Sequence, residues 1–485
     1  MRAHEAGALH ADIGHHGPEW LREPANVNAL LPQLWPHTVV RGGDGVVRVG
    51  GIPVTDLAAE YGTPSYVLDE TDLRDRARAY HQAFTDAFGA GLAASGGSAG
   101  ADVYYAAKAF CCKAVIRAVA EEGLNLDVCS GGELAVALAA GMDPARIGFH
   151  GNNKSLSELD RAVAAGVGRI IVDSFDEIDR LAALAADRGV VVPVMVRVTV
   201  GVEAHTHEYI ATAHEDQKFG FSLQRGHSLK GGAAAEAVRR ILAAPGLRLL
   251  GLHSHIGSQI YDASGFEVSA RRVLGLQALI RDEHGIEPPE LDLGGGFGIA
   301  YTTQDDPLEP GQIAGALAEI VAHECAGYGL AVPRISVEPG RSIVGPAALT
   351  LYEVGTVKTI ELDGGATRTY VSVDGGMSDN IRTALYDASY SATVANRAST
   401  APPVLARVVG KHCESGDIVV RDEFLPGDLA PGDLIAVPGT GAYTRSMANN
   451  YNHVPRPGVV AVTDGTARVI VRAETEDDLL RLDVG

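Results

Sequence analysis

Short, largely apolar runs alternate with longer amphipathic stretches between about residues 100 and 340. The apolar runs are rich in β-branched residues and the stretches between them have the helical period, a pattern typical of buried strands covered by helices. The predicted strands are Val103–Ala106, Asn125–Val128, Arg146–His150, Arg169–Asp173, Val192–Val198, Leu247–His255, Glu290–Leu293 and Arg334–Glu338. The predicted helices include Cys112–Glu122, Gly132–Ala140, Ser155–Ala165, Phe175–Arg188 and Ala233–Leu242. A doubly wound open sheet would also alternate, but the strand count and the length favour a (β/α)8 barrel.

Beyond about residue 345 the pattern changes to short strands separated by turns such as Asp-Gly and Pro-Gly. This texture predicts an all-β domain, a Greek-key-like barrel or sandwich. Its predicted strands are Ala347–Ile360, Thr369–Val373, Val404–Lys411, Asp417–Val420, Leu434–Val437, Val459–Val462 and Ala467–Ala473. Residues 46–54 have the same texture, so we expect the β domain to comprise 46–64 and 345–485. The barrel domain would then be 65–344, beginning with a strand at Ser65–Leu68.

Three segments show neither the strand–helix alternation nor the pattern of short strands and turns. Residues 1–45 are rich in His, Pro and Gly, and their composition favours a loosely ordered extension over a metal site at His10, His15 and His16. Gly91–Ala101 has the composition of a flexible loop. The connection 199–231 is long for a barrel, and such loops usually serve the mouth of an active site.

Composition narrows the class of protein. The formal net charge of −21 argues against a nucleic-acid or anionic-membrane partner, since like charges repel. The chain has no apolar run of signal-peptide type and none of membrane-spanning length, so we expect a soluble, cytoplasmic protein. Five cysteines without metal-type spacing suit a reducing compartment, namely Cys111, Cys112, Cys129, Cys325 and Cys413.

The chemistry of a barrel lies where its strands end. The first predicted strand leads into Lys108, which could simply extend its ammonium to water. Every other predicted strand, however, carries or ends in a polar or glycine cluster. These clusters are Asp127–Glu133, His150–Lys154, Asp173–Ser174, Arg197, His253–Ser258, Gly294–Gly298 and Glu338–Arg341.

The last clusters point to a phosphate. Barrels commonly bind phosphate at the loops after strands seven and eight. Here the seventh loop contains Gly294, Gly295 and Gly296, whose backbone a ligand can approach closely, and the eighth brings the guanidinium of Arg341. Ser258 adds a hydroxyl. A phosphate group facing a lysine predicts pyridoxal 5′-phosphate, with its aldehyde condensed onto Lys108.

Further residues suit that cofactor. A carboxylate at the pyridine nitrogen keeps the ring protonated, and Glu338 is placed for this. Arg197 could orient Glu338 or the ring, and Asp127 lies in a neighbouring strand-end cluster. His255 could stack on the ring, although a hydrogen-bonded core histidine has the same spacing.

The ordered motifs YAAKAF, HIGS, GGGFG, VEPGR, CESGD and GTGAY resemble those of the fold-type III pyridoxal-phosphate decarboxylases over nearly the whole chain beyond the N-terminal extension. Within them the chain is most similar to the diaminopimelate decarboxylases of actinobacterial type. The resemblance implies that Lys108 binds the cofactor covalently, that His255 stacks on its ring and that Glu338 pairs with the pyridinium. The implied phosphate and substrate-carboxylate ligands are Ser258, Gly294, Gly295, Gly296, Arg341 and Tyr443. In the family pattern, Cys413 and Glu414 enter the site from the second subunit of a homodimer.

The substrate can be argued from charge. Ornithine, arginine and lysine end in a cation alone, whereas meso-diaminopimelate ends in a second amino-acid group, so its pocket must also hold a carboxylate. Arg382 and Tyr386 lie four residues apart, a helix-face spacing that lets both reach one group, and Glu414 offers an anion for the distal ammonium. A surface Arg/Tyr pair near a turn is the alternative. We expect decarboxylation of meso-diaminopimelate to L-lysine and CO2.

Three competing functions share the cofactor site. A decarboxylase of ornithine, arginine or lysine would not need Arg382. An alanine racemase, by resemblance, places an arginine at the pyridine nitrogen, so Glu338 argues against it. A non-catalytic pyridoxal-phosphate-binding protein would not need a β domain that carries Cys413, Glu414 and Tyr443.

Overall fold

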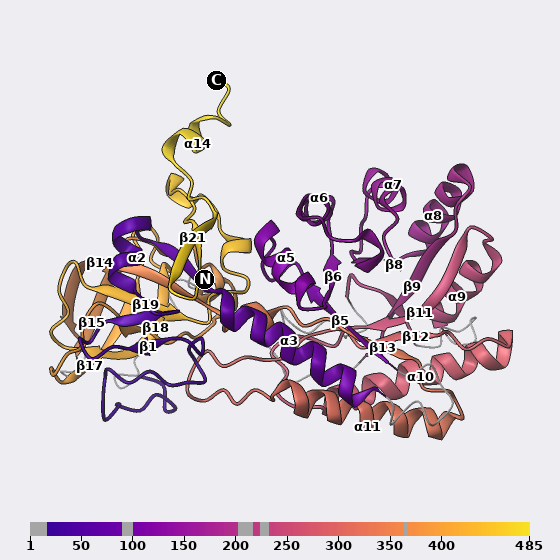
Figure 1. Ribbon diagram of the computed structural model, residues 1–485, viewed down its shortest axis with the longest axis horizontal. Helices are drawn as coiled ribbons and strands as arrows, with labels where there is room; N and C mark the ends of the chain where they lie inside the picture. Colours follow the sequence, from indigo (N-terminus) through magenta and orange to yellow (C-terminus); the bar gives the residue numbers. More distant parts are fainter. Residues whose placement is uncertain (1–16, 90–99, 202–216, 224–231, 363–366) are drawn as a thin grey trace, which may run out of the picture. The chain divides into compact units, whose positions relative to one another are not determined.

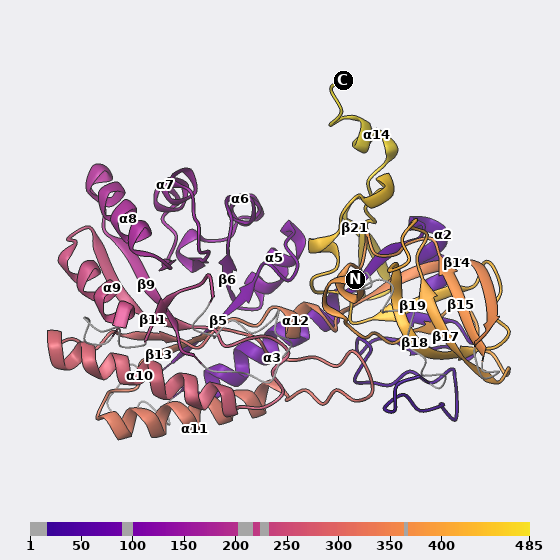
Figure 2. The same ribbon diagram turned by 180° about the vertical axis from the view of Figure 1, so that it is seen from behind.

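The computed structural model describes residues 17–89, 100–201, 217–223, 232–362 and 367–485. The chain divides into two compact units. The barrel unit comprises Arg74–Gly298 and Pro307–Ser342, and the β unit comprises Met1–Leu73, Ile299–Asp306 and Ile343–Gly485. Figures 1 and 2 show the elements of each unit from opposite sides.

The barrel unit contains eight parallel strands that close on themselves. They are β5 (Ala101–Ala106), β6 (Asn125–Val128), β7 (Ile147–Phe149), β8 (Arg169–Val172), β9 (Val192–Thr199), β11 (Leu247–Ser254), β12 (Glu290–Asp292) and β13 (Arg334–Val337). Each strand pairs in parallel with the next, and β13 pairs with β5, which completes the ring. The short strand β10 (Phe221–Ser222) adds to β9. The predicted barrel is confirmed, and every predicted strand ends within two residues of the observed one.

Helices lie around this sheet (Figure 1). They are α3 (Glu70–Ala87), α5 (Lys113–Glu121), α6 (Gly131–Ala140), α7 (Leu156–Ala165), α8 (Phe175–Arg188), α9 (Gly232–Ala243), α10 (Ser264–His284), α11 (Pro310–Tyr328) and α12 (Arg341–Val344). Three consecutive helices, α6, α7 and α8, begin with a serine whose hydroxyl accepts the backbone N–H of a glutamate three residues on. This cap satisfies a donor at the helix start, so each strand turns into its helix at a fixed residue.

The β unit is built on a nine-stranded sheet. Its strands are β4 (Ser65–Asp69), β14 (Ala348–Glu361), β15 (Thr367–Val373), β16 (Thr393–Val394), β17 (Pro403–Val409), β18 (Ile418–Pro426), β19 (Leu434–Pro438), β20 (Val459–Thr463) and β21 (Thr466–Val471). The strand at Ser65–Asp69, which the sequence places at the start of the barrel domain, instead pairs with β14 and β20. All five of its residues are buried, which a central strand of a sheet explains.

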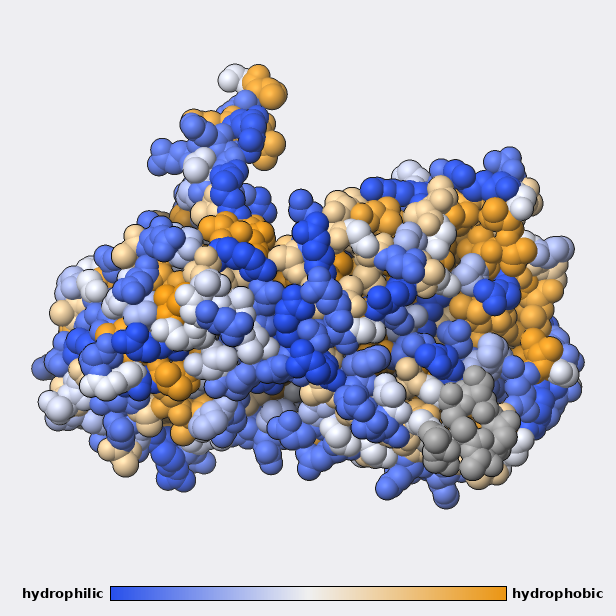
Figure 3. All heavy atoms as spheres, in the orientation of Figure 1, coloured by the Kyte–Doolittle hydropathy of each residue, from blue (hydrophilic) through white to orange (hydrophobic). Residues whose placement is uncertain are grey.

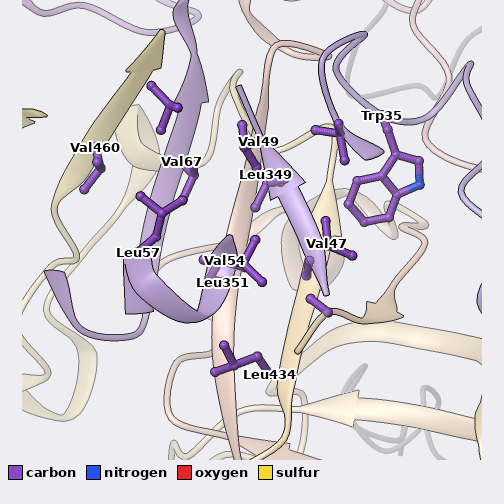
Figure 4. Close-up of a cluster of buried hydrophobic side chains, with 14 of the residues drawn as sticks. Trp35, Val47, Val49, Val54, Leu57, Val67, Leu349, Leu351, Leu434 and Val460 are labelled. Atoms are coloured by element: carbon purple, nitrogen blue, oxygen red, sulfur yellow. The ribbon is translucent and has the colours of Figure 1, made fainter. Parts of the chain in front are cut away.

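Residues 46–54 contribute to the same unit in an unexpected way. β2 (Val47–Val49) and β3 (Ile52–Pro53) form a separate three-stranded sheet with β1 (Val40–Arg41). Figure 4 shows Val47 and Val49 packed in one apolar cluster with side chains of the large sheet, among them Leu349 and Val460. Both ends of the chain therefore build the β unit, as expected, but through side-chain packing between two sheets. The remaining helices there are α2 (Val54–Tyr61), α13 (Arg382–Tyr386) and α14 (Glu476–Leu480).

Hydrophilic side chains cover much of the visible face in Figure 3, and hydrophobic ones gather near α8 and α9. Among the described helices, none combines the length and the apolar character needed to cross a lipid bilayer.

Candidate active site

The carboxyl ends of the barrel strands surround a cavity of about 290 Å³. Five residues predicted from the sequence line it, namely Lys108, Asp127, Arg197, His255 and Glu338. They come from the ends of β5, β6, β9, β11 and β13. Closure of the barrel thus brings together Lys108 and Glu338, which are 230 positions apart in the chain.

Lys108 is the exposed residue of an otherwise buried turn. Ala107 donates its backbone N–H to the Asp127 carbonyl (3.0 Å), and Ala109 donates to Ala106 (3.1 Å). Both alanines are fully buried. The turn after β5 is therefore tied to β6, and it presents the lysine side chain to the cavity.

The Glu338 carboxylate lies against two histidines. Its Oε1 is 3.0 Å from His253 Nε2 and 3.2 Å from His150 Nε2. Nε2 of His150 is also 3.1 Å from Asp127 Oδ1. Burial lowers the pKa of His150 to about 3 and holds the pKa of His253 well below its usual value, so both imidazoles are neutral. Burial, and then the nearby Asp127 carboxylate, raises the pKa of Glu338.

A layer of charged side chains inside the barrel lies next to Glu338 and its two histidines. Arg169 on β8 donates to Asp292 and, at 2.8 Å, to Ser336, and its guanidinium lies 3.7 Å from the centre of the Tyr104 ring. Burial raises the pKa of Asp292 to about 6. The arginine places a fixed positive charge among the carboxylates of Asp127, Asp292 and Glu338, whose pKa values it lowers against the effect of burial.

Arg197 connects the cavity to the long connection after β9. Its guanidinium lies over the Phe219 ring, 4.2 Å from the ring centre, and its Nε is 4.0 Å from Asp173 Oδ2. Thr199 Oγ1 donates to the Phe219 carbonyl at 2.6 Å, which holds the returning segment in place. Lys218 and Phe219 line the cavity, so the described part of this connection does serve the mouth; residues 202–216 and 224–231 lie outside the described residues.

In the glycine loop after β12, the backbone passes close to the backbones of Ser254, Gly257 and Glu338. A Cβ atom on Gly295 would lie 2.2 Å from the Glu338 carbonyl oxygen, and one on Gly296 would lie 2.3 Å from that of Gly257. Gly294 has a φ of +72° and a Cβ there would lie 2.5 Å from the Ser254 carbonyl oxygen. Only glycine fits between the neighbouring strand ends.

This close approach also orients His255. The backbone N–H of Gly295 donates to His255 Nδ1 at 3.3 Å, and burial keeps the pKa of His255 well below its usual value. A neutral ring that accepts at Nδ1 carries its proton on Nε2. Nearby, Arg341 donates to the Ser258 hydroxyl at 2.9 Å, so the loops after β11 and β13 meet; a phosphate site there stays a prediction.

The predicted substrate residues lie in the β unit. Arg382 and Tyr386 occupy the two ends of α13, which confirms the helix-face spacing. Arg382 is buried, donates to the Tyr390 hydroxyl at 2.6 Å and lies over the Tyr301 ring. Cys413 is exposed and Glu414 half-buried. Tyr443 has a φ of +61°, a strained conformation for a residue with a side chain. Their roles at the cavity stay predictions.

Sequence reasoning did not assign roles to His150 and His253. Both stand in the strand-end clusters, but their contact with Glu338 depends on the meeting of β7, β11 and β13.

The same clusters also contain a purely structural residue. Lys154 is buried, and its Nζ donates to Glu177 (2.7 Å) and to two backbone carbonyls.

The residues of the cavity fit pyridoxal phosphate. The exposed amine of Lys108 lies where an aldehyde could reach it, the Glu338 carboxylate could face a ring nitrogen, and the glycine loop has no side chains to block a phosphate. Asp127 Oδ2 is buried and has no hydrogen-bond partner among the described residues, which marks an acceptor for a bound group.

Comparisons with known proteins agree with this chemistry. Residues 75–345 match the model of the pyridoxal binding domain of pyridoxal-dependent decarboxylases. The diaminopimelate decarboxylase of Mycobacterium tuberculosis (strain ATCC 25618 / H37Rv) is 56% identical over 94% of this chain and 98% of its own length. That of Bacillus subtilis (strain 168) is 46% identical over 91% of this chain and 95% of its own length. The crystal structure of diaminopimelate decarboxylase from M. jannaschii in complex with L-lysine superposes with a TM-score of 0.83 at 30% identity, and covers 93% of this chain and 99% of that one.

Proposed function

The chain belongs to the pyridoxal-dependent decarboxylases, and within them to the diaminopimelate decarboxylases, and we propose from this premise which of its residues perform the reaction. The enzyme uses pyridoxal 5′-phosphate to remove CO2 from meso-2,6-diaminopimelate, which yields L-lysine in the last step of lysine biosynthesis. The observation that carries the assignment is the conjunction of full-length identity to such enzymes with a barrel cavity built around Lys108 and Glu338.

The cofactor would be held in the barrel unit. Lys108 would bind its aldehyde, Glu338 its ring nitrogen and His255 one face of its ring. Ser258, Arg341 and the loop of Gly294, Gly295 and Gly296 would hold its phosphate. When bound, pyridoxal phosphate accepts the electron pair that departing CO2 leaves behind. Glu338 maintains this capacity because its carboxylate holds a proton at the ring nitrogen.

His150 and His253 act through Glu338. Their Nε2 atoms both contact Oε1, which is buried. Packing against two neutral imidazoles would restrict the carboxylate, with its other oxygen facing the cavity. Arg197 and Asp127 flank the same group. These four residues are therefore positioning residues in this scheme, and only Glu338 touches the ring nitrogen.

The substrate's far end would be recognised by the β unit. Arg382 would bind the distal carboxylate together with Tyr386; Arg382 Nε has no hydrogen-bond partner among the described residues, so a donor is available. Glu414 would bind the distal ammonium, and Tyr443 a phosphate or carboxylate oxygen. Cys413 would act near the reacting carbon.

Cys413 and Glu414 would come from a second copy of the chain, so that a homodimer contains two shared active sites. In this scheme the barrel domain holds the cofactor and the β domain completes the partner's site. The net charge of −21 argues against a nucleic-acid partner.

The assignment is tested by CO2 release from meso-diaminopimelate, ornithine, arginine and lysine, assayed in parallel with the purified holoenzyme. Only meso-diaminopimelate should react at an appreciable rate. A site that bonds a distal carboxylate disfavours substrates without it by about 10⁴-fold, because its own polar groups are then left unpaired. Comparable turnover of a diamine-forming substrate would exclude the assigned specificity.

A further inference from the structure

A second cavity, of about 320 Å³, lies within the β unit. Residues 17–20 form one wall, with the half-buried indole of Trp20. The opposite walls come from β15, β17 and β18 and from the segment after α13, which supplies Ser389 and Tyr390. Three arginines line this cavity, and the proposed reaction uses none of them. They are Arg368, Arg407 and Arg421.

Strand pairing explains why these side chains converge. β15 and β17 run side by side, and their register puts Arg368 and Arg407 on the same face. β17 pairs with β18 through a bulge between Ala406 and Val408, which sets Arg407 against Arg421 and Asp422. Bulges redirect side chains, and they are frequent at sheet edges, where β18 lies, and beside active sites.

Two of the arginines are buried around a single carboxylate. Arg368 is 4% exposed and Arg407 is 1% exposed. Asp422 Oδ1 lies 3.4 Å from Arg407 NH2 and 3.9 Å from Arg368 NH2. Arg407 also donates from Nε to the Arg421 carbonyl at 2.8 Å.

Arg368 is the poorly satisfied member of the pair. Across the described ranges of the chain, its guanidinium donates no hydrogen bond, Asp422 is the only carboxylate within 4 Å of it, and its Nε is buried. A guanidinium stays protonated in proteins, so a net positive charge remains buried here. Arg421 is paired with Asp387, and the exposed Glu19 lies on the wall of the cavity; neither of these two carboxylates, Asp387 or Glu19, forms an ion pair with Arg368 within the described ranges.

We propose that this cavity binds a small molecule through one carboxylate or phosphate group held between Arg368 and Arg407. The planar fork of a guanidinium matches two oxygens of either group, and such an anion would neutralise the buried surplus charge. Asp422 and Glu19 limit the site to one anionic group, because a polyanion would meet their carboxylates. Ser389 and the Trp20 ring would contact the rest of the ligand.

Thermal unfolding of the full-length holoenzyme, saturated with cofactor, tests the site. Inorganic phosphate and acetate are compared separately with sodium chloride at equal ionic strength. We expect one of the two to raise Tm by roughly 3–5 °C in a saturable way, and chloride to have no such effect. A response to phosphate alone identifies a phosphate-bearing ligand, and a response to acetate alone a carboxylate. The absence of a saturable response to either would overturn the proposal.

Three variants assign the response to the cavity. Arg368→Met should abolish it without lowering Tm in chloride, since the buried charge that it removes faces, among the described carboxylates, only Asp422, at 3.9 Å, and Arg407 pairs with the same carboxylate. Arg421→Met, at the more exposed rim, should weaken the anion's apparent affinity roughly tenfold, and it keeps the test decisive if Arg368→Met does not fold. Arg456→Met removes an arginine of the same unit that is paired with Glu474, and it should leave the response intact. An undiminished response in the first two variants would place the anion elsewhere.

Discussion

Glu338 lies against the imidazoles of His150 and His253, which burial keeps neutral, and near the carboxylate of Asp127. Burial and the nearby Asp127 carboxylate both disfavour the ionised form of Glu338, and its pKa is raised accordingly. A cation bound beside it has the opposite effect. The protonated ring nitrogen of a bound cofactor would be such a cation, so cofactor binding and the ionisation of Glu338 should stabilise each other.

Replacement of Glu338 by glutamine tests this relation. Glu338→Gln should still bind the cofactor but lose most of kcat, because a neutral amide cannot hold the ring nitrogen protonated. A charged hydrogen bond contributes about 1.5–3 kcal/mol, which corresponds to a loss of roughly 10- to 150-fold or more. Steady-state kinetics and the cofactor content of the purified variant give the two quantities. Near-normal kcat would remove Glu338 from the assigned role.

His253 allows a test that separates positioning from packing. In His253→Gln the amide nitrogen can take the place of Nε2, whereas in His253→Asn it takes the place of Nδ1. Because Nε2 is the atom that contacts Glu338, glutamine should preserve most of kcat, and asparagine should lower it by roughly tenfold. The pH dependence of the visible cofactor spectrum should shift only in the asparagine variant. Equal effects of the two substitutions would indicate a packing role alone.

Lys108 carries the covalent attachment in this scheme. Lys108→Ala should abolish both the visible absorption of the bound cofactor and turnover, while the variant remains folded, since the side chain is exposed and makes no structural contact like that of Lys154. Lys113→Ala, an exposed lysine at the start of α5, serves as the matched control and should retain both. An unchanged spectrum in Lys108→Ala would place the attachment on another residue.

Among the elements, the loops after the barrel strands carry tighter constraints than the helices. Gly295→Ala would drive a methyl group into the Glu338 carbonyl, so we expect loss of the cofactor and a fall in Tm of several degrees. Gly315→Ala in α11 is the control, because a Cβ atom there meets nothing within 4 Å. In the middle of a helix it should stabilise the fold by about 0.5–1 kcal/mol. Thermal unfolding and cofactor content distinguish the two variants. A Gly295→Ala variant with a normal Tm and cofactor content would contradict the close approach of Gly295 to the Glu338 carbonyl.

The barrel strands were predictable because parallel strands are buried on both faces and so read as short apolar runs, β8 and β9 among them. The capped helices were predictable because Ser-x-x-Glu marks their starts. The sheet to which a strand belongs was not predictable in the same way. Ser65–Asp69 has the local pattern of any buried strand, and only its pairing with β14 and β20 assigns it to the β unit. Likewise, the contact of His150 and His253 with Glu338 exists only once three strands meet.

For the whole molecule, the proposed division of the chemistry between two units has the largest consequence. Lys108 and Glu338 belong to the barrel unit, whereas Arg382, Cys413 and Glu414 belong to the β unit. The recognition of the distal group can be tested on its own. Arg382→Ala should lose activity on meso-diaminopimelate without gaining any on ornithine, because the pocket's remaining polar groups would still lack partners. An unchanged KM for meso-diaminopimelate would refute the assignment.

The shared site is tested by mixing two inactive variants, Lys108→Ala and Cys413→Ala, and letting the chains exchange. In a two-fold dimer each chain both supplies and receives the cysteine. Random exchange makes half of the dimers mixed, and each mixed dimer contains one site with both an intact lysine and an intact cysteine. Activity should therefore recover to about a quarter of the wild-type value. If each site were built within one chain, every site in the mixture would keep a defect. Subunit exchange is verified independently, by mass spectrometry of differently labelled chains, so that exchange without recovery of activity would defeat the shared-site arrangement.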